Sequence, residues 1–166
     1  MSGDMKARRV KVLFVCIGNS CRSPMAEAVA RQDAGDTIEA FSAGLAPLGF
    51  VAAMTKQTLM KNGYAIDGLE SKPIAQGVWE QADIVINMSG RARELTFREY
   101  AKVEDWEIAD PYGDLEAYAS AFATIRRRVA DLAARLAASV PPRQTYGAKS
   151  AQPEKWAKGG SQGESV

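Results

Sequence analysis

The stretch VKVLFVCIGNSCRSPMAE, residues 10–27, determines how the rest of the sequence is interpreted. Residues 10–15 are β-branched or apolar apart from one lysine, which is typical of a buried strand. A short polar loop follows. Ser23-Pro24 then indicates a helix start, with the serine as N-cap and the proline at the first helical position. The stretch therefore predicts a strand, a loop and a helix in direct succession.

Strand and helix patterns alternate along the rest of the chain. Further strands are expected at 37–42, at 82–88 and ending at Glu107-Ile108, and further helices at 50–62, 91–101 and 115–140. The last helix carries an apolar stripe at spacings of three and four residues, and Pro141-Pro142 stops it. This alternation predicts an α/β fold with a parallel sheet covered on both faces. Ligands of such sheets lie beyond the carboxyl ends of the strands.

Length and composition indicate one globular domain. The 166 residues are assigned to a domain at 9–140, a flexible arm at 1–8 and a disordered tail at 141–166. Lys plus Arg total 21 and Asp plus Glu total 20, a balance that argues against a nucleic-acid-binding or membrane-surface protein. The sequence contains no run of 18 apolar residues and no signal-peptide pattern, which indicates a cytoplasmic protein.

Two absences restrict the chemistry. The sequence contains no histidine, which excludes Ser-His-Asp triads, Cys-His dyads and His-ligated metals. Its only cysteines are Cys16 and Cys21, too few for a structural zinc site and not a secreted disulfide framework. We therefore expect no metal and no cofactor.

The loop after the first strand has the features of an oxyanion site. A helix N-terminus offers free N–H groups, and Gly18 lets a short loop turn its amides inward. Arg22 adds a planar fork for phosphate oxygens. The same field should stabilise a thiolate at Cys16, since cysteines in such places have a pKa of about 3.5–7.5. Ser23 could donate a hydrogen bond to that sulfur, and Asn19 could hold the loop shape.

A thiolate beside an anion site suggests covalent transfer through a thiophosphate. The leaving group then needs a proton, and Asp110 is the best donor. It follows a predicted strand and precedes Pro111, which places it at the same edge of the sheet as Cys16. Tyr112 and Trp106 flank it and could form an aromatic wall for a flat substrate, although Trp106 could equally pack in the core.

Cys21 has two interpretations. It could be a core residue at the start of the helix, or it could protect Cys16 by forming a reversible disulfide, which requires Cα atoms within about 7 Å. Cys16 alone would most often be a small buried hydrophobe. The Cys-x5-Arg spacing on a strand-to-helix turn favours function.

The run V-C-I-G-N-S-C-R-S-P-M-A-E at 15–27 resembles the low-molecular-weight protein tyrosine phosphatase family. S-A-G at 42–44, the strand at 83–88 and D-P-Y-G at 110–113 lie where that family has them. The resemblance covers about residues 9–140. It implies a three-layer fold with a four-stranded parallel sheet of order 2-1-3-4. It implies Cys16 as nucleophile, Arg22 as oxyanion clamp and Asp110 as acid, with Asn19 and Ser23 as supports of the loop and the thiolate. The residues expected to bind phosphate or support the loop are Ile17, Gly18, Asn19, Ser20, Cys21 and Ser23, and Tyr112 is the expected substrate wall.

The same superfamily contains arsenate reductases and protein-arginine phosphatases. Ser20, before the second cysteine, resembles the arsenate reductases, whereas tyrosine phosphatases have Ile and arginine phosphatases have Thr there. Thioredoxin-coupled reductases use two further cysteines, and this chain has none after Cys21. A reductase that uses an external small thiol therefore stays open, as do phosphoarginine hydrolysis and a non-catalytic oxyanion-binding module. The expected partner is a phosphorylated protein or a small phosphate or arsenate substrate, and the expected state is a monomer or weak dimer.

Overall fold

The computed structural model describes residues 8–74, 81–97 and 102–139. Their strands are β1 (Val10–Cys16), β2 (Ile38–Gly44), β3 (Ile84–Asn87) and β4 (Val103–Asp105). Their labelled helices are α1 (Arg22–Asp33), α2 (Ala53–Lys61), α4 (Arg93–Thr96) and α5 (Leu115–Ser139). The expected tail lies outside the described residues, as does the expected arm apart from Arg8. Residues Arg9–Ala137, which contain the whole sheet, form one compact unit.

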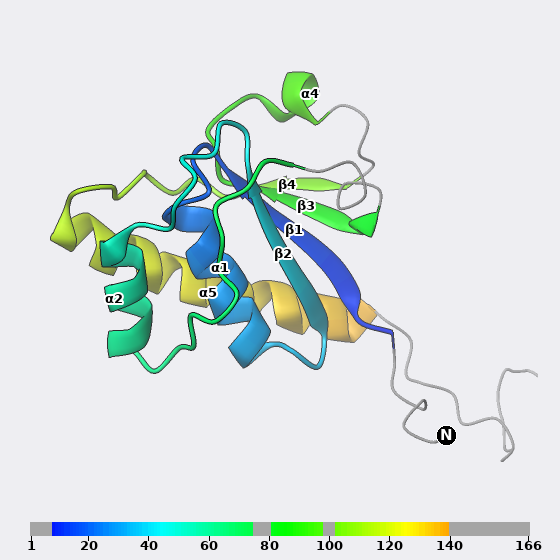
Figure 1. The fold of residues 1–166 in the computed structure, drawn as a ribbon. Coiled ribbons are helices and arrows are strands. Elements are labelled where there is room, and N and C mark those ends of the chain that lie inside the picture. Colours follow the sequence, from blue (N-terminus) through cyan, green and yellow to red (C-terminus); the bar gives the residue numbers. More distant parts are fainter. Residues whose placement is uncertain (1–7, 75–80, 98–101, 140–166) are drawn as a thin grey trace, which may run out of the picture. The chain divides into compact units, whose positions relative to one another are not determined.

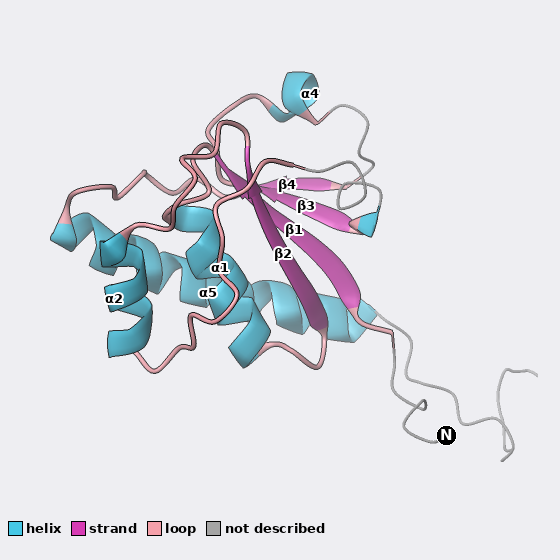
Figure 2. Ribbon diagram, viewed as in Figure 1, coloured by secondary structure: helices cyan, strands magenta, loops and turns pink. Residues whose placement is uncertain are grey.

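The sheet has four parallel strands in the order β2-β1-β3-β4, which confirms the expected fold (Figure 1). Because all pairs are parallel, the loops after β1, β3 and β4 gather at one edge (Figure 2). Gly44, expected to follow the second strand, is its last residue and pairs with Cys16. The loop after β1 therefore begins beside the end of a neighbouring strand.

Both faces of the sheet are covered, as the alternation of side chains along β1 shows. Val12, Leu13, Phe14 and Val15 are all fully buried, although successive residues point to opposite faces. On one face Leu13 and Val15 pack in a cluster with Phe97, which follows α4. On the other face the ring of Phe14 lies 5.7 Å from that of Trp106.

The start of α1 differs from the expectation. The helix begins at Arg22 with Cys21 as the N-cap and no side-chain cap bond, so Ser23 is not the cap. Pro24 is the third helical residue, where its missing N–H is still harmless because the first helical bond is Met25 N–H to the Cys21 carbonyl. The Ser23 hydroxyl contacts Cys16 and Asn19 instead. The first amides of α1 are therefore left without a capping side chain.

The fourth strand lies earlier than expected. Residues 103–105 pair with β3, and the Trp106 amide donates to the Asn87 carbonyl at 3.0 Å. Since β3 ends at Asn87, Glu107-Ile108 has no remaining partner in the sheet and is loop. The helix expected at 91–101 is only one turn long in α4, and 98–101 lie outside the described residues.

The expected helices at 50–62 and 115–140 are present as α2 and α5. Gly63, with φ +86°, follows the end of α2 in the left-handed conformation that glycine adopts most readily. Val140, the last apolar residue of the expected stripe, lies outside the described residues. Among the described residues, no helix combines the length and the apolar character needed to span a membrane.

Candidate active site

An outer layer of hydrogen bonds orients the loop at 17–21, which joins β1 to α1. The segment at 45–55 supplies most of the donors to the loop carbonyls. The bonds are Leu45 N–H to Cys16 O (3.1 Å), Ala46 N–H to Ile17 O (2.8 Å), Leu48 N–H to Gly18 O (3.0 Å), Ala52 N–H to Ser20 O (3.1 Å) and Thr55 Oγ1 to Ser20 O (2.8 Å). The described chain contains no cis peptide, and in a planar trans peptide the N–H points opposite to the C=O. The amides that follow these carbonyls therefore turn away from 45–55, where they can line a nest for an anion.

Asn19 fixes the bend of this loop. Its φ is +47°, a left-handed conformation that asparagine tolerates better than other non-glycine residues. The buried side-chain amide donates to the hydroxyls of Ser23 (2.7 Å) and Ser42 (3.1 Å), and its oxygen accepts from the Lys72 amide (2.9 Å). Gly44 lies against it, because a Cβ at that position would be 2.8 Å from the Cβ of Asn19. The loop thus has one well-determined shape.

Cys16 lies at the end of β1 beside this bend. Its thiol is free and buried, and Sγ is 3.0 Å from the Ser23 hydroxyl. Because the Asn19 amide donates to that hydroxyl oxygen, the Ser23 proton is available to the sulfur, with the more distant Ala43 carbonyl (3.5 Å) as its other acceptor. Ser23, expected to support the sulfur, is placed where it can do so.

The Arg22 guanidinium is held from behind by two backbone carbonyls. Nη1 donates to the carbonyl of Met88, just after β3, at 2.7 Å and to that of Ile108, in the loop after β4, at 3.0 Å. The head group is buried, and its Nε is one of two buried side-chain polar atoms of the described residues that lack a hydrogen-bond partner. The other is the Ser20 hydroxyl. An immobilised guanidinium with an unsatisfied N–H is suited to bind an oxyanion through its remaining edge.

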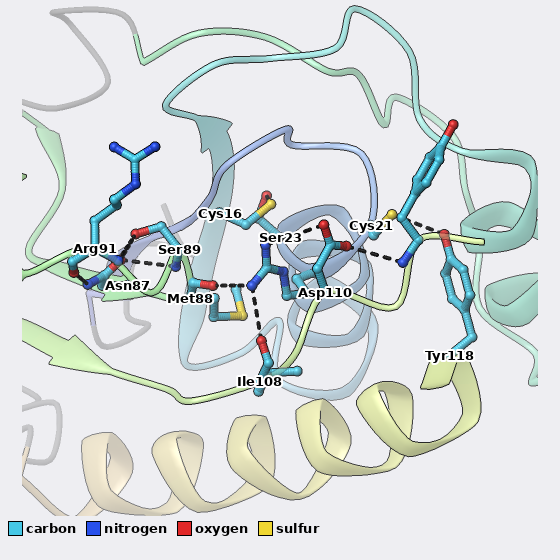
Figure 3. A network of polar contacts seen from close by, with 12 residues as sticks. Cys16, Cys21, Ser23, Asn87, Met88, Ser89, Arg91, Ile108, Asp110 and Tyr118 are labelled. Atoms are coloured by element: carbon cyan, nitrogen blue, oxygen red, sulfur yellow. Dashed lines mark hydrogen bonds and ion pairs between the residues drawn. The ribbon is translucent and has the colours of Figure 1, made fainter. Parts of the chain in front are cut away.

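Asp110 lies at this head group, as expected. Its Oδ2 is 3.9 Å from Nη2 of Arg22, and its side chain is 55% exposed, so it faces the entrance of the site. The Tyr112 amide donates to Asp110 Oδ1 at 3.2 Å, which fixes the carboxyl within its turn. Figure 3 shows Cys16, Ser23 and Asp110 grouped around the side chain that bonds to Met88 and Ile108. Cys16, at the end of β1, and Asp110, in the loop after β4, are 94 positions apart in the chain and are thus brought together.

The flanking aromatic residues separate into two kinds. Tyr112 is 56% exposed beside Asp110 and can contact a substrate. Trp106 is buried against Phe14 and donates its Nε1–H to Glu104 at 2.9 Å, so it belongs to the core. Of the two interpretations of Trp106, packing is the one that the structure supports.

Cys21 is buried at the start of α1, on the outer side of the loop. Its Sγ is 3.0 Å from the Tyr118 hydroxyl of α5, and burial raises the pKa of this thiol. Both thiols are free in the structure. Cys21 therefore packs in the core and forms a hydrogen bond, in line with the first of its two interpretations, and the reversible disulfide with Cys16 stays a prediction.

Sequence reasoning missed several residues around the site. The carbonyls of Met88 and Ile108 hold Arg22, and backbone groups leave no signature in a sequence. Leu48 packs over the loop, since a Cβ on Gly18 would lie 3.1 Å from its Cγ. Leu48 and Phe50 are each about half exposed, and such apolar side chains in a loop rich in Gly and Pro were a signal that could have been used.

No group of three or more Cys, Asp or Glu side chains in the described ranges could hold a metal ion.

Comparisons with known proteins agree with this geometry. The family model for low molecular weight phosphotyrosine protein phosphatase matches residues 11–142. A probable low molecular weight protein-tyrosine-phosphatase from Ralstonia nicotianae is 34% identical over 131 residues, 71% of this chain and 90% of the relative. A glutaredoxin arsenate reductase from Synechocystis is 33% identical over 129 residues, 76% of this chain and 98% of the relative. The structure of an arginine phosphatase from Geobacillus stearothermophilus superposes with a TM-score of 0.70 at 26% identity, covering 78% of this chain and 94% of that one.

Proposed function

This chain belongs to the low molecular weight phosphotyrosine protein phosphatase family, and from that premise we propose that it hydrolyses phosphotyrosine in proteins, or aryl phosphates, through a cysteinyl-phosphate intermediate. We propose Cys16 as the nucleophile, Arg22 as the oxyanion clamp and Asp110 as the acid and base. Ile17, Gly18, Asn19, Ser20, Cys21 and Ser23 form or support the anion loop.

One observation carries this proposal. The Arg22 guanidinium is fixed by two carbonyls, while its buried Nε has no partner. A buried charged donor without a partner is costly, so a protein keeps one where a ligand completes it. The ligand must be an anion that accepts hydrogen bonds from a planar fork, as a phosphoryl group does.

In the first step the Cys16 thiolate attacks phosphorus, and an S–P bond forms as the bond from phosphorus to the leaving oxygen breaks. The Ser23 hydroxyl lies 3.0 Å from Sγ and can donate to the thiolate. The loop amides and Arg22 bind the equatorial oxygens as charge shifts onto them. Asp110, protonated at the start, gives its proton to the leaving oxygen, and a phenol or alcohol departs.

In the second step water attacks the phosphocysteine. The Asp110 carboxylate accepts one proton of that water while the S–P bond breaks. Phosphate leaves, and Cys16 is again a thiolate. The exposed position of Asp110 allows this, because the same carboxyl can reach first the leaving group and then the water.

An apolar rim favours an aryl ester. Tyr112, Leu48 and Phe50 are each half exposed, in the two loops that border the anion site. A flat ring that buries its faces against such side chains gains about 25 cal/mol for each Å² removed from water.

Steady-state hydrolysis of para-nitrophenyl phosphate and of phosphotyrosine peptides at mildly acidic pH tests the proposal. We expect turnover by the wild type and none by Cys16→Ser, with folding of the variant checked by circular dichroism. Turnover that persists in Cys16→Ser rules out this mechanism.

A second candidate is arsenate reduction with an external thiol. Two observations favour it: Ser20 in the loop, and 33% identity to a glutaredoxin arsenate reductase of which 98% is covered. Arsenate-dependent oxidation of small thiols, with and without glutaredoxins, decides between the two. Activity with none of them removes this candidate. Phosphoarginine belongs in the same comparison, because an arginine phosphatase shares the fold.

A further inference from the structure

A second polar network lies behind the anion loop and takes no direct part in the proposed reaction. It joins Cys21 at the start of α1, Tyr118 on α5 and Thr55 on α2. The Tyr118 hydroxyl is 3.0 Å from Cys21 Sγ and 2.9 Å from Thr55 Oγ1, and Thr55 Oγ1 donates to the Ser20 carbonyl at 2.8 Å. All three side chains are at most 4% exposed. Figure 3 shows the link between Cys21 and Tyr118 on the side of Cys21 away from Met88.

The Ser20 carbonyl, at the end of this network, fixes the direction of every hydrogen bond in it. A carbonyl can only accept, so the single proton of the Thr55 hydroxyl goes to Ser20. Tyr118 must then donate its single proton to Thr55, and the Cys21 thiol must donate to Tyr118. Burial raises the pKa of both the Cys21 thiol and the Tyr118 phenol, so both groups carry the protons that this order needs.

We propose that Tyr118 and Thr55 are positioning residues for oxyanion binding: with Cys21 they form a one-way hydrogen-bond chain that holds the Ser20 carbonyl outward and thereby turns the Cys21 amide toward the anion. The Ser20 carbonyl and the Cys21 amide belong to one planar trans peptide, in which the N–H points opposite to the C=O. This inference rests on the proposed function, because it assumes that the loop binds a phosphoryl group.

This hydrogen-bond chain also connects two helices, α2 and α5, to the peptide between Ser20 and Cys21. The Ala52 amide already bonds to the Ser20 carbonyl at 3.1 Å, just before α2. Thr55 adds a second bond from the first turn of α2, and Tyr118 ties this hydroxyl to α5. The backbone bond from Ala52 to the Ser20 carbonyl persists when the side chains are changed. Loss of the side-chain hydrogen bonds should therefore weaken anion binding rather than abolish it.

The test measures the Kd of inorganic phosphate for the full-length protein. The Kd is obtained from the phosphate concentration that protects Cys16 from alkylation by iodoacetamide, an assay that needs no turnover. We expect Thr55→Val to weaken phosphate binding by about tenfold, the effect of one buried hydrogen bond. Tyr118→Phe should weaken it by less, because the bond from Thr55 to the Ser20 carbonyl stays in place. Thr55→Ser keeps the hydroxyl and should stay within about twofold of the wild type.

The two Thr55 variants separate positioning from packing. Valine keeps the volume and loses the hydroxyl, whereas serine keeps the hydroxyl and loses a methyl group. If Thr55 only fills space, serine is the weaker binder, and the inference is overturned. Tyr64→Phe is the matched control, since it removes a buried tyrosine hydroxyl that donates to Asp33 at 2.6 Å away from the loop. It should leave the Kd of phosphate unchanged even if it lowers Tm.

The outcomes also separate this inference from the proposed function. If phosphate protects the wild type and Thr55→Val equally well, the positioning role is wrong and the proposed function stands. If phosphate does not protect wild-type Cys16 at all, the anion site is wrong and both fall. Should Tyr118→Phe fail to fold, the Thr55 pair still decides the outcome.

Discussion

Replacing Arg22 by lysine should greatly reduce activity although the positive charge is kept. Nη1 of the guanidinium donates to the carbonyls of Met88 and Ile108, at 2.7 and 3.0 Å, and the opposite edge is left to bind the substrate. A lysine ammonium is a single point that cannot serve both sides at once. Two lost hydrogen bonds to a charged group, at about 1.5–3 kcal/mol each, give about 3–6 kcal/mol. At 1.36 kcal/mol per tenfold this predicts a loss of about 10²–10⁴-fold in kcat/KM.

The assay is kcat/KM for para-nitrophenyl phosphate, with thermal unfolding measured in parallel. Arg93→Lys is the matched control, because Arg93 also donates to a backbone carbonyl, that of Val103, but is half exposed and outside the site. It should retain wild-type activity. A folded Arg22→Lys that stays within about tenfold of the wild type would refute the two-sided role of the guanidinium.

Three further changes have expected outcomes. Asp110→Asn should lower kcat by about 10²–10⁴-fold for phenyl phosphate, and by less for para-nitrophenyl phosphate, whose leaving group needs little protonation; equal losses with both esters would contradict the acid role. Gly44→Ala should reduce the free energy of unfolding in urea by about 1–3 kcal/mol, because the new Cβ would lie 2.8 Å from atoms of the loop; unchanged stability would contradict that contact. Burial opposes the charge of Glu104, but hydrogen bonds from Arg135 and Trp106 outweigh it and lower its pKa below 4.5. Glu104→Gln should therefore cost about 0.5–1 kcal/mol at pH 7, and the cost should vanish as the pH falls through the lowered pKa, so a cost that persists in acid would be inconsistent with the ion pair.

The part of the site that is contiguous in the sequence could be predicted from it. Cys16 and Arg22 are separated by one tight loop, so their proximity follows from a strand-to-helix turn alone. Asp110 is distant in the chain, but parallel strands bring their carboxyl ends to one edge, and that rule placed it correctly.

The misses have two physical causes. Ser23 matches the pattern of a helix N-cap, but a nearby sulfur and amide compete for its hydroxyl, and a sequence does not reveal that competition. Glu107-Ile108 was expected in a strand, yet β3 had already ended, and a strand exists only where a partner does. The two carbonyls that hold Arg22 could not be predicted either, because a backbone carbonyl can come from any residue type.

The central claim is that phosphate passes through the sulfur of Cys16. Rapid acid quench during turnover of an aryl phosphate, followed by peptide mass spectrometry, tests it most directly. The account predicts one added phosphoryl group on the peptide that carries Cys16, located on that sulfur rather than on Cys21, and no such group in Cys16→Ala. Turnover with the phosphoryl group on another residue, or undiminished turnover by Cys16→Ala, would contradict it.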